Sequence, residues 1–85
     1  MKEFSYEIKD PMGLHARPAG LLVKEAAAFK SAITITAPGG KADAKRIMAV
    51  MRLAAKQGNT LTFTCEGEDE AAAADKLQSF LAANL

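Results

Sequence analysis

The sequence predicts an α+β fold, an open-faced β-sandwich in which three helices cover one face of a four-stranded antiparallel sheet. Four short segments alternate apolar and polar residues and three others repeat apolar residues at helical spacing, in the order β-α-β-β-α-β-α. Strands that alternate in this way have one face against a core and one in water, as in antiparallel sheets. Because a chain of 85 residues does not support two cores, we expect residues 1–85 to form a single domain.

Residues 3–9 are expected to form the first strand, because apolar and polar side chains alternate there. The apolar members are Phe4, Tyr6 and Ile8. Turn residues at 10–13 then separate this strand from a helix predicted over 16–29, with Lys24 and Glu25 facing outward. The apolar stripe of that helix consists of Ala19, Leu22, Val23 and Ala26.

The middle of the chain predicts a hairpin and a second helix. Ile33 and Ile35 alternate with threonines and precede a Pro-Gly-Gly turn, so a short third strand is expected near 41–44. Apolar residues at spacings of three and four predict a helix over 47–56, and Gly58 is a suitable residue just past its end. The stripe of this helix consists of Ile47, Val50, Met51 and Ala54.

The last third of the chain predicts one strand and one helix. Residues 61–65 alternate apolar residues with threonines, which indicates a half-buried strand ending before Gly67. Three acidic residues at 68–70 then place negative charge at the start of the final helix, where the helix dipole favours it. The apolar stripe of this helix consists of Ala74, Leu77, Phe80 and Leu81.

Composition excludes several classes of function. The longest apolar stretches are a few residues long, against about 20 needed to cross a bilayer, and the alternating amino terminus is unlike a secretory signal, so we expect a cytoplasmic protein without membrane insertion. One cysteine and one histidine do not complete a zinc site, and we expect neither a metal nor a cofactor.

Charge is distributed unevenly along the chain. Residues 1–56 hold ten Lys/Arg against five Asp/Glu, whereas residues 57–85 hold one Lys against five Asp/Glu. A basic half is compatible with nucleic acid, but RNA-binding sheets expose aromatic residues for base stacking, and the five aromatics here mostly alternate as core residues do. We therefore expect an acidic protein partner and no nucleic acid.

The segment 12–18 concentrates the chemistry of the sequence, because it places the only histidine at a helix start. The first N–H groups of a helix lack internal acceptors and favour anions, and Pro18 fits the first turn, where no N–H is needed. Arg17 adds a forked cation suited to a phosphoryl group, and a neutral imidazole is a nucleophile. The candidate phosphate-binding residues are His15, Ala16, Arg17 and Pro18. The competing interpretation is that His15 is an ordinary surface residue, although histidine is a poor N-cap.

Three segments of the sequence resemble the HPr family, the histidine-containing phosphocarriers of the bacterial sugar phosphotransferase system. They are Gly13-Leu14-His15-Ala16-Arg17-Pro18-Ala19, Lys45-Arg46-Ile47-Met48-Ala49-Val50-Met51 and Glu66-Gly67-Glu68-Asp69-Glu70, and the likeness spans essentially the whole chain. The resemblance implies that His15 is phosphorylated on Nδ1 by enzyme I, which draws on phosphoenolpyruvate, and that the group passes to an enzyme IIA. It also implies that Arg17 steadies the phosphoryl group, and that the protein is a carrier and not an enzyme.

The family resemblance also implies a partner surface at the exposed end of the first helix and the face of the second. We expect a monomer whose partner-binding residues are Gly20, Lys24, Arg46, Ile47, Met48, Met51 and Arg52. Ile47 and Met51 also lie at core-type spacing, so burial of some of them is expected, whereas Met48 lies off that stripe. Gly20 replaces a bulkier residue of the family and should weaken its helix by up to about 1 kcal/mol.

Arg46 is the larger departure from the family pattern. Family members of low-GC Gram-positive bacteria carry at this position a serine that a kinase phosphorylates, and Arg46 has no hydroxyl. Two alternatives therefore stay open beside the phosphocarrier: an HPr-like regulatory paralogue that keeps His15, and a ligand-binding module, because a similar β-α-β-β-α-β order occurs in ferredoxin-like domains.

Overall fold

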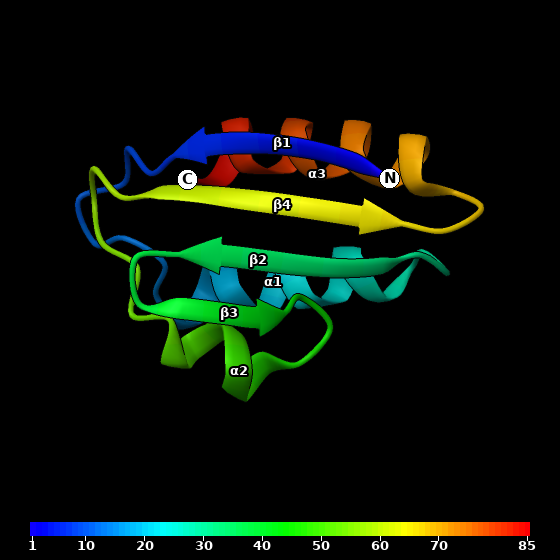
Figure 1. The fold of residues 1–85 in the computed structure, drawn as a ribbon. Helices are drawn as coiled ribbons and strands as arrows, with labels where there is room; N and C mark the ends of the chain where they lie inside the picture. Colours follow the sequence, from blue (N-terminus) through cyan, green and yellow to red (C-terminus); the bar gives the residue numbers. More distant parts are fainter.

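The computed structural model describes all 85 residues and confirms the predicted fold class. Its strands β1 to β4 are all antiparallel, in the spatial order β1-β4-β2-β3, and its three helices lie together on one side of the sheet (Figure 1). The elements are β1 (Lys2–Glu7), α1 (Ala16–Ala27), β2 (Ala32–Ala37), β3 (Gly40–Asp43), α2 (Ile47–Arg52), β4 (Thr60–Glu66) and α3 (Glu70–Asn84).

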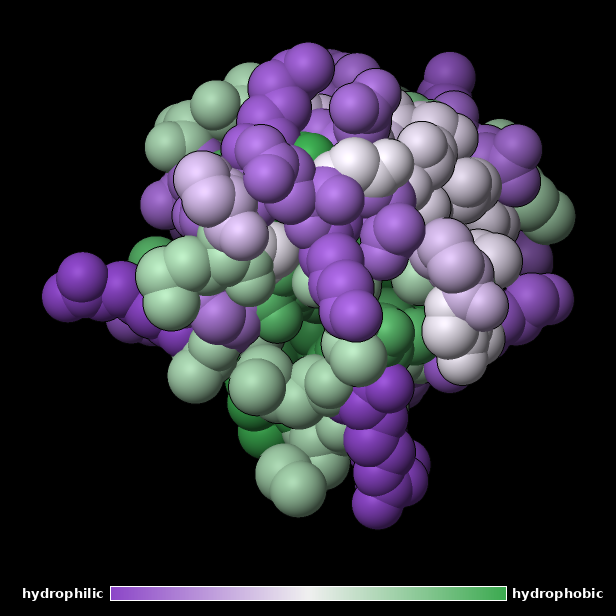
Figure 2. All heavy atoms as spheres, turned by 90° about the vertical axis from the view of Figure 1, so that its left-hand side faces the viewer, coloured by the Kyte–Doolittle hydropathy of each residue, from purple (hydrophilic) through white to green (hydrophobic).

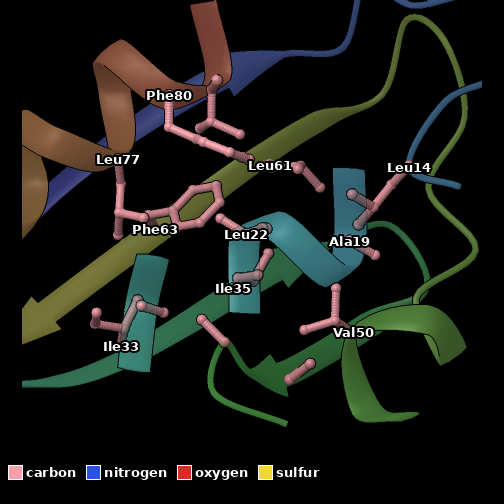
Figure 3. Packing of buried hydrophobic residues seen from close by; sticks show 14 of the residues in the cluster. Leu14, Ala19, Leu22, Ile33, Ile35, Val50, Leu61, Phe63, Leu77 and Phe80 are labelled. Atoms are coloured by element: carbon pink, nitrogen blue, oxygen red, sulfur yellow. The ribbon is translucent and has the colours of Figure 1, made fainter. Parts of the chain in front are cut away.

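The core lies between the sheet and the helices. In β4, Leu61, Phe63 and Cys65 are fully buried while the threonines between them are half-buried, so the alternation seen in the sequence corresponds to two faces of the strand. The ring of Phe4 in β1 stacks on that of Phe63, with centroids 5.0 Å apart. Figure 3 shows side chains from α1, α3 and the sheet converging on this layer, among them Leu22, Phe63 and Leu77.

The second helix is shorter than predicted. It spans six residues and ends at Arg52, whereas the apolar spacing predicted a helix to residue 56. The chain turns at Ala54, which has a positive φ of 48°, and the carbonyl of Ala55 then accepts a hydrogen bond from the Leu14 N–H at 3.0 Å. Gly58, with a φ of 90°, lies in the following turn and does not cap the helix. A contact with the distant loop before α1 therefore replaces the last helical turn.

Smaller differences concern the ends of the first two elements. Strand β1 ends at Glu7, although Ile8 is fully buried and its backbone still bonds to Asn59 and Gly58. Helix α1 ends at Ala27, two residues earlier than expected, and Glu25 is half-buried where an outward position was predicted.

Asp69 links the start of α3 to the loop between α1 and β2. Its side chain does not cap its own helix, although Asp69 occupies the N-cap position. Instead, the carboxylate accepts hydrogen bonds from the backbone N–H of Lys30 at 2.8 Å and of Ser31 at 2.9 Å, and from the Ser31 hydroxyl. Besides placing negative charge at the start of α3, the acidic segment 68–70 therefore connects this helix to the loop before β2 through Asp69.

We expect the Asp69 contacts to make folding stability depend on acid pH. The Ser31 hydroxyl and the Lys30 N–H lower the pKa of the Asp69 carboxyl, so its contribution is complete above the unfolded-state value of about 3.9 and is lost as the pH falls through the lower folded-state value. Asp69→Asn should therefore lower Tm at pH 7, and the difference from wild type should shrink toward pH 2.5. Asp75→Asn is the control, because Asp75 is an exposed residue of the same helix whose carboxylate makes no hydrogen bond. It should change neither Tm at pH 7 nor the dependence of Tm on pH. A Tm difference for Asp69→Asn that is constant from pH 7 to 2.5 would contradict this assignment.

Candidate functional site

The loop before α1 is held in shape by Asp10 and Gly13. Asp10 Oδ1 accepts the N–H of Met12 at 2.8 Å, and the Asp10 carbonyl accepts the N–H of Gly13 at 2.8 Å. Gly13 has a φ of +67°, which favours glycine, and a Cβ there would lie 2.5 Å from the carbonyl oxygen of Ala55. The loop therefore packs directly against the segment that follows α2.

His15 is the N-cap residue of α1 and makes no side-chain capping bond, as expected for a poor N-cap. Its backbone is extended, its carbonyl accepts the N–H of Ala19, and its imidazole is left free for other contacts. The side chain is 31% exposed, so it is less open to solvent than its position in a turn suggested. Its Nε2 lies 3.6 Å from Oδ2 of Asp10.

His15 lines a shallow pocket of about 160 Å³, and Arg17 is the only cationic residue in its lining. The pocket residues are Asp10, His15, Arg17, Pro18, Leu21 and Asn84. The backbone N–H groups of Ala16 and Arg17 donate to no acceptor in the protein, and Pro18 has none to donate. The site thus combines an imidazole, a guanidinium and two free N–H groups at the positive end of a helix, a combination suited to a phosphoryl group.

Comparison with known proteins gives the family. A family model described as "PTS HPr component phosphorylation site" matches residues 2–83. The chain belongs to the HPr family. It is accordingly a phosphotransferase-system phosphocarrier and not an enzyme in its own right, in agreement with the prediction from the sequence.

Several HPr relatives are similar over nearly their full length. The phosphocarrier protein HPr of Lysinibacillus sphaericus is 44% identical over 81 residues, which cover 95% of this chain and 92% of the relative. The HPr-like protein Crh of Halalkalibacterium halodurans is 46% identical over 81 residues, which cover 95% of this chain and 96% of the relative. Among solved structures, HPr from Thermoanaerobacter tengcongensis superposes with a TM-score of 0.92 at 42% identity, covering 98% of this chain and 93% of the other. Both HPr and Crh are therefore among the relatives.

An apolar surface lies beside the pocket of this HPr chain. Figure 2 looks onto the end of the molecule that carries the loop before α1, and hydrophobic side chains gather in its lower half, at the height of α1 and α2. Met48 is 66% exposed, Ile47 40% and Met51 36%. The expectation that some of Ile47 and Met51 are buried is therefore wrong, because in the short helix α2 only Val50 points into the core.

The structure adds residues that the sequence did not point to. Leu21 on α1 is 44% exposed and lines the pocket, and Met12 in the loop is 72% exposed. Asp10 was interpreted only as a turn residue, and Asn84 was not singled out. A carboxylate five positions before the histidine is a weak signal for a contact between them, because the contact depends on how the loop folds.

Three basic residues on or beside α1 and α2 are exposed. Lys24, Arg46 and Arg52 are exposed, and none of them forms an ion pair. Gly20 is exposed on α1, and no neighbouring atom lies within 4 Å of the place where its Cβ would be. The larger hollow of the molecule, about 520 Å³, lies along β2 and β3 and contains no histidine. The one histidine of the chain lines the smaller pocket.

Proposed function

We propose that His15 accepts a phosphoryl group from enzyme I and passes it to the enzyme IIA domains of the phosphotransferase system. The observation that carries this proposal is the position of the imidazole, in one pocket with Arg17 and next to the two free N–H groups of α1. The family to which the chain belongs supports both partners. We also propose that the protein works in the cytoplasm; no helix combines the length and hydropathy needed to traverse a bilayer.

The pocket suits the charge of phosphoryl transfer. The transferring group has a loose transition state with negative charge spread over three oxygens, so catalysis consists mostly of positioning and charge stabilisation. The N–H groups of Ala16 and Arg17 and the Arg17 guanidinium supply donors beside the imidazole. Pro18 is buried and contributes shape to the pocket.

The test of the proposed function is transfer of phosphate from phosphoenolpyruvate. With enzyme I present, the protein should gain one phosphate that is labile in acid and stable in base, as expected of a phosphohistidine, and added enzyme IIA should remove it. Absence of any phosphate would refute the phosphocarrier assignment to His15. Gain of phosphate without transfer to any enzyme IIA would favour the regulatory alternative, which the similarity to Crh supports.

We propose that partners dock on the apolar surface of α1 and α2 and on the three exposed basic residues on or beside these helices, with Met48 at the centre. Flexible methionine side chains adapt to more than one partner, and exposed cations steer an acidic partner toward the surface. The docking residues in this proposal are Gly20, Lys24, Arg46, Ile47, Met48, Met51 and Arg52. We propose that the protein binds its partners as a monomer, whereas Bacillus subtilis Crh was solved as a swapped dimer.

Arg17→Ala should slow transfer more than it weakens docking. The guanidinium lies in the pocket with His15, so its loss should reduce kcat by about 10²-fold, the usual effect of removing one donor to a developing charge, while KM for enzyme I changes little. Lys24 is an exposed cation on the same helix but outside the pocket, so Lys24→Ala should raise KM for enzyme I and change kcat little. Steady-state kinetics with enzyme I checks both variants. A raised KM with unchanged kcat in Arg17→Ala would make Arg17 a docking residue.

Arg46→Ser should stabilise the protein and slow its phosphorylation at low salt. Arg46 is the N-cap residue of α2 without a capping bond, and a serine there supplies the missing acceptor, worth about 1 kcal/mol. Arg46→Ala is the matched control, because it removes the same charge and adds no cap. At low salt, both variants should be phosphorylated more slowly than the wild type and to the same extent, and at high salt all three rates should be equal. Only the serine variant should have a higher Tm. Rates that equal wild type at every salt concentration would show that Arg46 does not steer enzyme I.

A further inference from the structure

A carboxylate that the proposed function does not use lies against the imidazole. We propose that Asp10 is a positioning residue for phosphoryl transfer: its carboxylate keeps the ring proton of His15 on Nε2, so that Nδ1 presents its lone pair to the phosphoryl group. This inference rests on the proposed function of His15, with Nδ1 as the acceptor atom that the family resemblance implies. It adds a residue that neither the sequence motif nor the helix start supplies.

The geometry of the loop fixes the Asp10 carboxylate in place. Oδ1 accepts the Met12 N–H at 2.8 Å, which leaves Oδ2 directed at His15 Nε2, 3.6 Å away. The backbone of Asp10 is held at both ends, because its N–H donates to the Leu85 carbonyl at 2.9 Å and its carbonyl accepts the Gly13 N–H at 2.8 Å. The side chain is only 26% exposed. The carboxylate therefore does not turn away from the ring without losing the turn bond.

The chemistry of the two groups selects one tautomer. An ionised carboxylate is an acceptor only, and a neutral imidazole carries one N–H and one lone pair. Oδ2 beside Nε2 therefore favours the proton on Nε2 and the lone pair on Nδ1. The 3.6 Å separation is longer than a direct hydrogen bond, but hydrogen bonds that serve a reaction are commonly long in the free protein and tighten in the reactive complex.

The transfer step then needs no proton movement at the ring. The Nδ1 lone pair forms the N–P bond, the bond between phosphorus and the donor atom of enzyme I breaks, and its electron pair stays on that donor. The proton on Nε2 remains, so the phosphorylated ring gains one positive charge. Asp10 faces that charge on Nε2, on the opposite side of the ring from the phosphoryl oxygens, and a hydrogen bond between two charged groups is stronger than one to a neutral ring.

Two variants separate this role from that of a turn residue. In Asp10→Asn, the amide oxygen keeps the bond to the Met12 N–H and the NH₂ group faces Nε2 as a donor, which favours the proton on Nδ1. In Asp10→Ser, the hydroxyl also accepts from Met12 but leaves Nε2 to water. A role limited to the turn predicts the same behaviour for both variants, whereas a role at the ring predicts that asparagine is the more harmful.

The experiment combines a tautomer measurement with a rate. Long-range ¹H–¹⁵N spectra of His15 at about pH 9, where an ordinary imidazole is neutral, should place the proton on Nε2 in the wild type and shift it toward Nδ1 in Asp10→Asn. The rate of phosphorylation by enzyme I should fall about 10- to 100-fold in Asp10→Asn, by analogy with the loss of a carboxylate that orients a metal-binding histidine, and less in Asp10→Ser.

The outcomes distinguish this inference from the proposed function. An unchanged proton on Nε2 in Asp10→Asn, or equal rates and spectra for the two variants, overturns the positioning role of Asp10. If the wild type gains no phosphate while the tautomer shifts as expected, the proposed function fails and the control of the ring by Asp10 stands. Circular dichroism at 25 °C confirms that both variants are folded in each measurement.

Discussion

Replacing His15 by alanine should abolish phosphoryl acceptance from enzyme I and leave the fold intact. No other imidazole exists in the chain, so no other residue can form an acid-labile phosphohistidine. The side chain makes no capping bond, and the backbone bonds of His15 to Gly13 and Ala19 do not depend on it. We therefore expect the free energy of unfolding to change by less than about 1 kcal/mol, because the contact of the imidazole with Asp10, at 3.6 Å, is longer than a direct hydrogen bond.

Phosphate content by mass spectrometry after incubation with phosphoenolpyruvate and enzyme I measures this result, and Tm provides the control for folding. One acid-labile phosphate in His15→Ala would show that the acceptor is another residue. A Tm lowered by ten degrees or more, which corresponds to about 1–2 kcal/mol for a domain of this size, would show instead that the imidazole is part of the packing.

Gly13→Ala should have the largest effect on stability among the single substitutions near the site. The residue has a φ of +67°, and its new Cβ would lie 2.5 Å from the Ala55 carbonyl oxygen and 2.8 Å from the Cα of Lys56. A left-handed conformation costs an alanine about 1 kcal/mol, and moving the Ala55 carbonyl weakens its hydrogen bond with Leu14, worth about 1 kcal/mol more. We expect a loss of at least about 2 kcal/mol and a Tm lower by about 8–16 °C.

Gly20→Ala is the matched control for Gly13→Ala. Gly20 lies inside α1 with no neighbouring atom within 4 Å of the added Cβ, so the same substitution should stabilise the protein by up to about 1 kcal/mol. The transfer rate should fall in Gly13→Ala, because the loop that places His15 is displaced from the segment after α2. If the two alanine variants have the same Tm, the close approach of Gly13 to Ala55 does not exist in solution.

Most of the fold was predictable because it depends on local patterns. Alternation gave the four strands, and helical spacing gave the three helices, within a few residues of their observed bounds for all elements except α2. The end of α2 was not predictable, because the left-handed turn at Ala54 accompanies a hydrogen bond between Leu14 and Ala55, which are far apart in sequence. Ile47 and Met51 were assigned partly to the core because they share a helical stripe with Val50, but both are exposed.

The site was predictable in its position and not in its full composition. A lone histidine before Arg17 and Pro18 at a helix start already indicated an anion site, and the structure places these side chains around one pocket. Asp10 was recognised as part of a turn, but the direction of its second carboxylate oxygen depends on the folded loop. Local sequence therefore indicated three residues of the candidate pocket and missed Asp10, whose carboxylate lies beside the ring.

The bonds that hold the loop before α1 have a consequence for its order. The N–H groups of Lys9 and Asp10 donate to the carbonyl of Leu85, and the N–H of Leu14 donates to Ala55, so the loop is anchored to residues 41 and more positions away. The two bonds to Leu85 require the end of α3 to be in place, so fraying of the last turn of α3 removes two of the bonds that hold the loop. The order of the loop that carries His15 therefore depends on Leu85, which is 75 or more positions away from Lys9 and Asp10 in the sequence.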